Sequence, residues 1–262
     1  MDLVTELRAL HHIRSSGMLG LDPPPTAFKV VRAIRRYGNL GGAVAVAAVK
    51  HGDRTGLIDE LGSLSFAELE ARSDALAVAL RARGIDESTG VGILCRNHRY
   101  LLDGTFAACK VGARTLYLNT DFGAPQLHDV CEREGVSLLI HDEEFSELAA
   151  PIEATRLTED EIQELIDSHA GAVPPAPREP STVVLLTTGT PKGAPRHLGH
   201  TLSPLGALLS KVPYRSREAT YVAAPMFHGL GFTQMVLAVM LGSTTITQRR
   251  FNPERVLEAV AG

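Results

Sequence analysis

The 262-residue sequence is poor in the features that mark secreted or membrane-spanning proteins. It has no tryptophan, and its cysteines, Cys95, Cys109 and Cys131, are odd in number and widely spaced. Such thiols are typical of reduced, buried residues in a cytosolic protein and not of a disulfide framework. The apolar runs fall short of the ~20 residues that a membrane helix needs, and the first residues lack a signal-peptide core. These absences predict a cytoplasmic protein without a transmembrane segment.

Basic residues are too few and too scattered to predict nucleic-acid binding. The 26 Lys and Arg residues are outnumbered by 30 Asp and Glu residues, which gives a net charge of −4. A protein whose main partner is a phosphate backbone usually carries a dense basic patch. Only Arg32, Arg35 and Arg36 cluster locally. This cluster is most simply a solvated helix face, with contact to a membrane or an acidic partner as the alternative.

Apolar runs alternate with amphipathic segments along most of the chain. Continuous apolar strands between helices are typical of a parallel sheet that is buried on both faces. The sequence therefore predicts an α/β fold with layered, largely parallel sheets flanked by helices. The predicted helices cover 1–10, 26–37, 66–83, 100–111, 125–134, 158–168, 202–209, 232–241 and a last one opened by Asn252 and Pro253. The predicted strands cover 57–59, 91–95, 115–118, 137–140, 183–186, 220–224 and 244–247.

Residues 185–196, Leu-Leu-Thr-Thr-Gly-Thr-Pro-Lys-Gly-Ala-Pro-Arg, place an apolar strand directly before a turn rich in glycine and hydroxyl groups. Gly189 and Gly193 let the backbone adopt positive φ and approach a ligand closely. Successive amides in such a turn form a concave anion site. The side chains that add donors or positive charge are Thr187, Thr188, Thr190 and Lys192. The composition predicts a polyphosphate site, with an ordinary strand–turn junction as the alternative.

This turn does not fit a Walker loop, which needs G-x-x-x-x-G-K-[ST]. It resembles instead the phosphate loop of the adenylate-forming superfamily, the acyl-CoA synthetases and their relatives, whose pattern is T-S-G-T-T-G-x-P-K-G. Residues 187–193 match the second half of the pattern, T-T-G-x-P-K-G, at every position. The strand runs straight into this half, so three residues of the family pattern are absent.

A second segment, 224–232, resembles the family's P-[LM]-[FY]-H motif and follows a predicted strand. The resemblance places Phe227, His228 and Gly229 at the wall of an acyl pocket. The carboxyl end of a strand in an open α/β sheet is where ligands bind, and His228 offers an ionisable group there. A histidine that only caps the helix starting near Gly229 is the alternative.

Weaker similarity extends over most of the remaining chain. Residues 64–69 and 108–114 resemble two structural motifs of the family, the first with a capping box formed by Ser65 and Glu68. The amino-acid sequences of residues 90–99 and 115–122 resemble those of the fatty acyl-CoA ligase branch of the family. The resemblance runs from about Ala27 to the last residue, but it covers only the amino-terminal half of the family.

The resemblance implies a ligase that activates a fatty acid or a similar carboxylate. ATP and the acid would give an acyl-adenylate, and coenzyme A would then displace AMP to form the thioester. Lys192 and His228 would be the catalytic residues, and His228 would also bind the substrate beside the α-phosphate. The residues that would bind ATP or AMP are Thr187, Thr188, Gly189, Thr190, Lys192 and Gly193.

Parts of the family pattern are not found in these 262 residues. They are the Y-G-x-T-E segment with its Mg²⁺-linked glutamate, the ribose-binding aspartate, and the small carboxy-terminal domain with a catalytic lysine. No metal ligand is therefore assigned in this chain. The first hypothesis is a ligase portion that is weak or inactive alone and needs a separate carboxy-terminal half; a homo-oligomer is the alternative partner. The others are a non-catalytic acyl- or nucleotide-binding module and a decayed fragment.

A proline-rich stretch at 171–180 suggests a boundary within the chain. Its prolines fit neither a helix nor a central strand, so we expect an exposed linker. This gives a first α/β subdomain with amino-terminal helices at 1–170. The second subdomain, 181–262, would carry the phosphate loop and the acyl pocket and would be incomplete.

Overall fold

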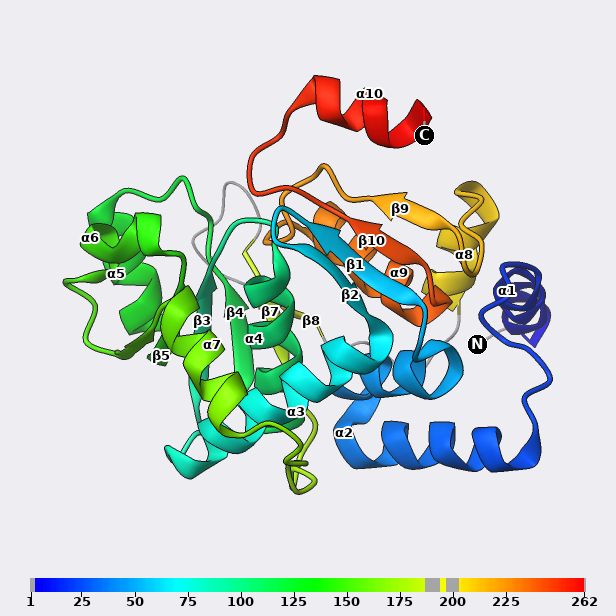
Figure 1. The fold of residues 1–262 in the computed structure, drawn as a ribbon, viewed down its shortest axis with the longest axis horizontal. Helices are drawn as coiled ribbons and strands as arrows, with labels where there is room; N and C mark the ends of the chain where they lie inside the picture. The colour runs from blue at the N-terminus through cyan, green and yellow to red at the C-terminus, as the bar shows by residue number, and fades with distance from the viewer. Residues whose placement is uncertain (1–2, 187–193, 197–202, 262) are drawn as a thin grey trace.

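The computed structural model describes residues 3–186, 194–196 and 203–261. Two β-sheets and the helices packed against them form a layered α/β fold (Figure 1). The larger sheet has the strand order β6-β5-β3-β4-β7-β8, and the smaller sheet has the order β2-β1-β10-β9. All neighbouring strands are parallel except β7 with β8 and β1 with β2. The predicted fold class is confirmed.

The bounds of the elements are as follows. The larger sheet contains β3 (Gly90–Leu94), β4 (Arg114–Tyr117), β5 (Val136–His141), β6 (Thr155–Leu157), β7 (Val183–Leu185) and β8 (Ala194–Arg196). The smaller sheet contains β1 (Thr55–Asp59), β2 (Gly62–Ser65), β9 (Ala219–Tyr221) and β10 (Thr244–Ile246). The helices are α1 (Leu3–Ser15), α2 (Pro24–His51), α3 (Phe66–Ala82), α4 (Arg99–Lys110), α5 (Ala124–Arg133), α6 (Ser146–Ala149), α7 (Glu159–Ser168), α8 (Ser203–Lys211), α9 (Gly229–Leu241) and α10 (Pro253–Ala261), together with the short 3₁₀ helix η1 (Glu143–Phe145).

The hydrophobic core covers both faces of the larger sheet. Side chains alternate across a strand, so Tyr117 of β4 faces one cluster while its neighbour Leu116 faces the other. The first and larger cluster joins the two sheets through α3, α4 and α9, and the second lies under α5. Every residue of β3 is buried, as the continuous apolar run in the sequence predicts.

Helix α2 is the largest departure from the predicted elements. The sequence predicts a helix over 26–37, but α2 continues to His51 across a kink at Gly38, where φ is +73°. Beyond the kink the helix is buried, and a Cβ on Gly41 would come within 3.2 Å of the Cys109 backbone. Glycine lowers helix propensity, but close packing against α4 outweighs it here. The short strands β2, β6 and β8 and the short helices η1 and α6 are also absent from the predicted elements.

The stretch 171–180 contains neither helix nor strand, as expected. It is tied to α2, because the Tyr37 hydroxyl donates to the carbonyl of Pro174 at 3.1 Å. Both sheets combine strands from the two sides of this stretch. The division into subdomains at 171–180 stays a prediction.

In the part of the chain that the structure describes, no helix combines the length and apolar character needed to cross a membrane.

Candidate functional site

Strand β7, which precedes the predicted phosphate turn in the sequence, ends at the carboxyl edge of the larger sheet. Strand β7 pairs with β4, so Leu185 lies opposite Tyr117, and the turn follows this strand directly in the sequence. In open α/β sheets this edge is where ligands bind. The predicted phosphate ligands Thr187, Thr188, Gly189, Thr190, Lys192 and Gly193 lie outside the described residues, so their roles stay predictions.

The predicted acyl-pocket residues Phe227 and His228 lie between β9 and α9, and Gly229 is the first residue of α9. His228 occupies the N-cap position of α9, but its imidazole makes no capping hydrogen bond. The capping alternative therefore does not account for this side chain. The imidazole packs on Phe227, with ring centroids 4.5 Å apart. Phe227 is buried and His228 is half-buried, which leaves the imidazole partly open to a ligand.

The loop before His228 is fastened to the larger sheet by Asn97. The Asn97 Oδ1 accepts a hydrogen bond from the Met226 N–H at 2.7 Å. Its Nδ2 donates to the carbonyls of Ala224 at 2.9 Å and Val222 at 3.3 Å. Asn97 is itself buried and lies shortly after the end of β3 at Leu94. One amide side chain thus fixes both the distance and the register of this loop against the sheet.

Asn97 is not among the site residues predicted from the sequence. The available signal was a polar side chain placed just after the uninterrupted apolar run of β3. That pattern indicates a residue at the carboxyl edge of a buried strand, but it does not reveal which distant segment the side chain will bind.

Aromatic packing links the two motif regions from the other side. The Tyr117 ring, opposite Leu185 of β7, meets the Phe232 ring of α9 edge to face at a centroid distance of 5.1 Å. The Tyr117 hydroxyl lies 2.6 Å from the Thr105 hydroxyl. Burial raises the pKa of Tyr117 well above its ordinary value, so the phenol stays neutral. Strand β4, the neighbour of the strand that precedes the phosphate turn, and the helix that follows His228 are therefore in direct contact.

Helix α9 also approaches the 224–225 backbone closely at Gly231. A Cβ on this glycine would lie 2.3 Å from the Pro225 carbonyl oxygen, whereas a Cβ on Gly229 would meet nothing within 4 Å. We expect Gly231→Ala to destabilise the fold by about 1–3 kcal/mol, because backbone must move to admit the methyl group. Urea denaturation measures the change, and Gly229→Ala serves as the matched control with no loss expected. Equal stability of both variants would contradict this packing.

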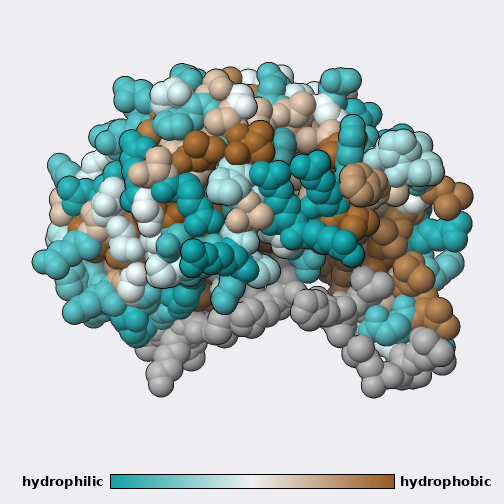
Figure 2. Space-filling view, turned by 90° about the horizontal axis from the view of Figure 1, so that it is seen from below, coloured by the Kyte–Doolittle hydropathy of each residue, from teal (hydrophilic) through white to brown (hydrophobic). Residues whose placement is uncertain are grey.

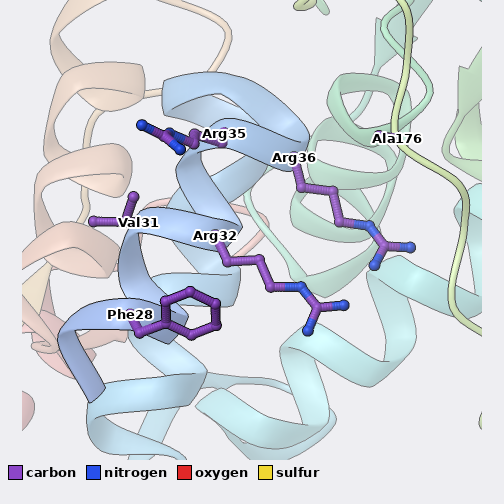
Figure 3. Close-up of a pocket in the computed structure, with 6 residues that line it drawn as sticks. All are labelled: Phe28, Val31, Arg32, Arg35, Arg36 and Ala176. Carbon is purple, nitrogen blue, oxygen red and sulfur yellow. The ribbon is translucent and has the colours of Figure 1, made fainter. Parts of the chain in front are cut away.

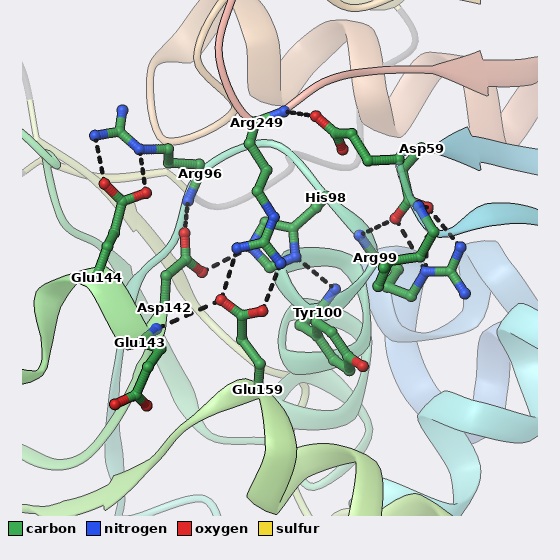
Figure 4. A network of polar contacts seen from close by, with 12 residues as sticks. Asp59, Arg96, His98, Arg99, Tyr100, Asp142, Glu143, Glu144, Glu159 and Arg249 are labelled. Carbon is green, nitrogen blue, oxygen red and sulfur yellow. Dashed lines mark hydrogen bonds and ion pairs between the residues drawn. The ribbon is translucent and has the colours of Figure 1, made fainter.

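Buried ion pairs join the carboxyl edges of the two sheets (Figure 4). Asp59, at the end of β1, accepts the Arg99 backbone N–H at 2.9 Å and its Nε at 3.0 Å. Arg99 opens α4 directly after the β3 edge. Burial opposes ionisation of Asp59, but the hydrogen bonds and charge of Arg99 outweigh it and lower the carboxyl pKa. The smaller sheet is thereby anchored to the larger one beside Asn97.

The segment after β10 makes a second connection in the same region. Arg249 donates to Glu159 of α7 at 2.7 Å, and this hydrogen bond raises the pKa of Arg249. Glu144 accepts from Arg96 at 2.6 Å and from Arg250 at 2.9 Å. These ion pairs fix the position of one sheet edge relative to the other (Figure 4). The loops that follow the strands at those edges are therefore also held in position relative to one another.

Cys95, His98 and Asp142 are the one group of potential metal ligands among the described residues, with ligand atoms within 4.8 Å of one another. His98 Nε2 lies 2.6 Å from Asp142 Oδ1, and His98 Nδ1 accepts the Tyr100 N–H. Asp142 Oδ2 accepts the Arg96 N–H at 2.8 Å. Burial raises the pKa of Cys95, which keeps the thiol protonated. These groups satisfy one another and support the strand edge, so we assign no metal to them.

Comparisons with known proteins agree with this arrangement. The AMP-binding enzyme family matches residues 44–261. A feruloyl-CoA synthase from Amycolatopsis sp. is 34% identical over 219 residues, which cover 81% of this chain and 43% of the relative. The chain thus spans less than half the length of that relative.

Solved structures show the same fold. A Mycobacterium tuberculosis fatty acyl CoA synthetase superposes with a TM-score of 0.74 and 21% identity, covering 85% of this chain and 47% of that one. The o-succinylbenzoate coenzyme A synthetase of Bacillus subtilis, in complex with ATP and magnesium ion, has a TM-score of 0.72 and 24% identity, covering 84% and 60%. Since the family match includes most of the chain and both edges described above, this protein belongs to the AMP-binding enzymes, the adenylate-forming superfamily that its motifs resemble.

Proposed function

We propose that this chain is the amino-terminal part of a CoA ligase that uses ATP to convert a carboxylic acid into an acyl-adenylate. The proposal rests on the contacts that hold the histidine loop next to the strands at the phosphate motif. Asn97 and Phe232 hold the Phe227–His228 loop beside the strand pair β4–β7, from which the phosphate turn leaves. Acid and nucleotide would then bind next to each other, as attack of the carboxylate oxygen on the α-phosphorus of ATP with release of pyrophosphate requires.

The proposed roles follow from the chemistry of the side chains. Lys192 and the threonine hydroxyls of the turn would neutralise and orient the β- and γ-phosphates. His228, half-buried beside Phe227, would hydrogen-bond the carboxylate next to the α-phosphate. Such groups accelerate a reaction by alignment and charge neutralisation, without a covalent enzyme intermediate. ATP with Mg²⁺ would supply the activated phosphorus and coenzyme A the thiol, but no residue of this chain is assigned to the metal.

The acid is proposed to be either a fatty acid or an aryl-propenoic acid. The similarity to the fatty acyl-CoA ligase branch favours the first, and the 34% identical feruloyl-CoA synthase favours the second. Both present an apolar body and a carboxylate, which suits a buried phenylalanine next to a half-buried histidine. Calorimetric titration with ferulate and with a fatty acid, each with and without Mg-ATP, distinguishes them. Binding of neither acid would contradict the proposed pocket, and acid binding without ATP binding would indicate a non-catalytic module.

Replacing Lys192 with alanine is expected to weaken ATP binding by roughly 10- to 100-fold, because a hydrogen bond to a charged group contributes about 1.5–3 kcal/mol. Affinity for the acid should change little. Both are measured by calorimetry on the same protein preparation.

Lys211→Ala is the matched control, since Lys211 is exposed at the end of α8. It removes the same charge and should leave both affinities unchanged. Equal losses of acid and ATP affinity in Lys192→Ala would count against the separate roles of the two motifs.

A further inference from the structure

The first half of α2 exposes large apolar side chains to solvent. Phe28 is 70% exposed, Val31 48% and Ile34 41%. Leu21, in the segment that leads into the helix, is almost fully exposed. Phe28, Val31 and Ile34 recur at helical spacing on one side of α2, which lies along the lower edge of the molecule (Figure 1). An exposed apolar stripe of this kind marks an interaction surface more often than a solvated one.

The same half of α2 is strongly basic. It carries Lys29, Arg32, Arg35 and Arg36, and α2 contains no acidic residue. Within the described part of the chain, none of these cations forms an ion pair with a carboxylate. The net charge of the whole protein is −4, so this positive surface stands out against an acidic background. Cations interleaved with Phe, Val and Ile on one helix are the composition of a helix that lies in a membrane interface.

A groove of about 420 Å³ runs along this helix, lined by Phe28, Val31, Arg32, Arg35, Arg36 and Ala176. Arg32 and Arg36 extend to the same side of the helix, and the Phe28 ring lies beside Arg32 (Figure 3). Arg36 donates to the Pro174 carbonyl, and its Nε is buried without a hydrogen-bond partner. Seen from below, polar and apolar surface adjoin over this part of the molecule (Figure 2). Guanidinium groups beside an aromatic ring match a lipid phosphate with its glycerol and upper acyl chain.

We propose that this face of α2, defined by Phe28, Val31, Arg32, Arg35 and Arg36, rests on an anionic bilayer surface. The arginines contact lipid phosphates, and Phe28 with Val31 enters the interface between headgroups and acyl chains. The protein then binds peripherally, which agrees with the lack of a spanning helix among the described residues. This surface lies on a different element from the loop of the proposed acid site, so the proposal does not depend on the proposed function.

Because the sequence contains no tryptophan, Phe28→Trp gives a single fluorescent probe on the surface in question. With vesicles of 70% phosphatidylcholine and 30% phosphatidylserine at low salt, its emission should shift to the blue and be quenched by brominated lipids. Leu257→Trp, on the exposed face of α10, is the matched control and should show neither change. Vesicle binding without a response at Phe28→Trp would overturn the proposal.

Charge dependence is tested by vesicle sedimentation. Each basic residue near an anionic surface contributes about fivefold to partitioning, so Arg32→Gln with Arg35→Gln should lower binding by roughly 25-fold. The control Arg83→Gln with Lys211→Gln makes the same charge change at exposed positions at the carboxyl ends of α3 and α8 and should have little effect. Pure phosphatidylcholine vesicles should bind the unaltered protein much more weakly, and raised salt should release it.

Other ligands of the same charge give different results. If duplex DNA binds as tightly as the vesicles and gives no blue shift, the surface is a nucleic-acid site and the proposal is wrong. If millimolar inorganic phosphate displaces the protein completely from vesicles, the groove is a free-phosphate site and the bilayer is not its ligand. Equal binding of the unaltered protein and the double arginine variant would also overturn the proposal.

Discussion

Lys110→Met is expected to lower the free energy of unfolding by about 3–5 kcal/mol, the range found when one partner of a buried ion pair is removed. Lys110 is fully buried in the last turn of α4. Its ammonium group donates to Asp74 at 2.6 Å, to Glu70 at 2.8 Å and to the Ser73 hydroxyl at 2.8 Å. The variant keeps the volume of the side chain but leaves two carboxylates of α3 without their cation. Chemical denaturation at neutral pH measures the loss.

The size of this loss should depend on pH. Burial raises the pKa of Glu70, although Lys110 lowers it in part. Removing Lys110 takes away that lowering, so the pKa of Glu70 in the variant should rise further. A carboxyl whose folded pKa lies above its unfolded pKa stabilises the fold less as pH rises through that interval. The deficit of Lys110→Met should therefore be smaller at pH 5 than at pH 7.5.

Two further variants make the Lys110 prediction specific. Lys211→Met removes an exposed lysine and should change stability by less than about 0.5 kcal/mol. Adding Glu70→Gln to Lys110→Met should restore part of the lost stability, because it removes one of the stranded charges. A deficit that is unaffected by pH and by Glu70→Gln would show that lost packing, and not unpaired charge, is the cause.

Asn97→Leu is expected to release the loop that carries Phe227 and His228. The Met226 N–H and the Ala224 carbonyl lose their Asn97 partner, whereas the Val222 carbonyl still accepts from the Thr247 hydroxyl. Each buried polar group left unsatisfied costs about 1–3 kcal/mol. The loop can recover some of this by moving toward water, so we expect a total loss of about 2–4 kcal/mol. Amide hydrogen exchange at Met226 should become much faster, whereas exchange in β5 should change only as far as global stability does.

The functional part of this prediction separates positioning from general stability. If His228 binds the acid, Asn97→Leu should reduce acid affinity at least about tenfold even well below the unfolding transition, because aligned donors lose their geometry. Asn119→Leu is the matched control, because the Asn119 Oδ1 accepts the Asp121 N–H within the same exposed turn. If Met226 exchange becomes rapid but acid affinity is unchanged, Asn97 only anchors the loop, and the acid binds at a site other than the His228 loop.

Much of the layered fold could be predicted because it depends on local pattern. Buried parallel strands have continuous apolar sequences, and the β3 run predicted such a strand correctly. The capping box at Ser65 and Glu68 fixed the start of α3 in the same way, with the Glu68 N–H donating to the Ser65 hydroxyl at 3.2 Å. Helices α3, α4, α5 and α7 agree with their predicted ranges to within one residue. The low helix propensity of glycines such as Gly41 led to a predicted helix end at residue 37, whereas α2 continues to His51.

The phosphate-turn and histidine motifs, the family and the fold class follow from the sequence, because a short run of residues carries each of these signals. Only the tertiary structure shows that Asn97 joins the histidine loop to β3 and that Tyr117 packs against Phe232. It also pairs Lys110 with carboxylates 36 and 40 positions away in the chain. Such contacts depend on which distant segments the packing of two sheets brings together. Hydrogen bonds and charges act over a few ångströms in space, whatever the separation along the chain.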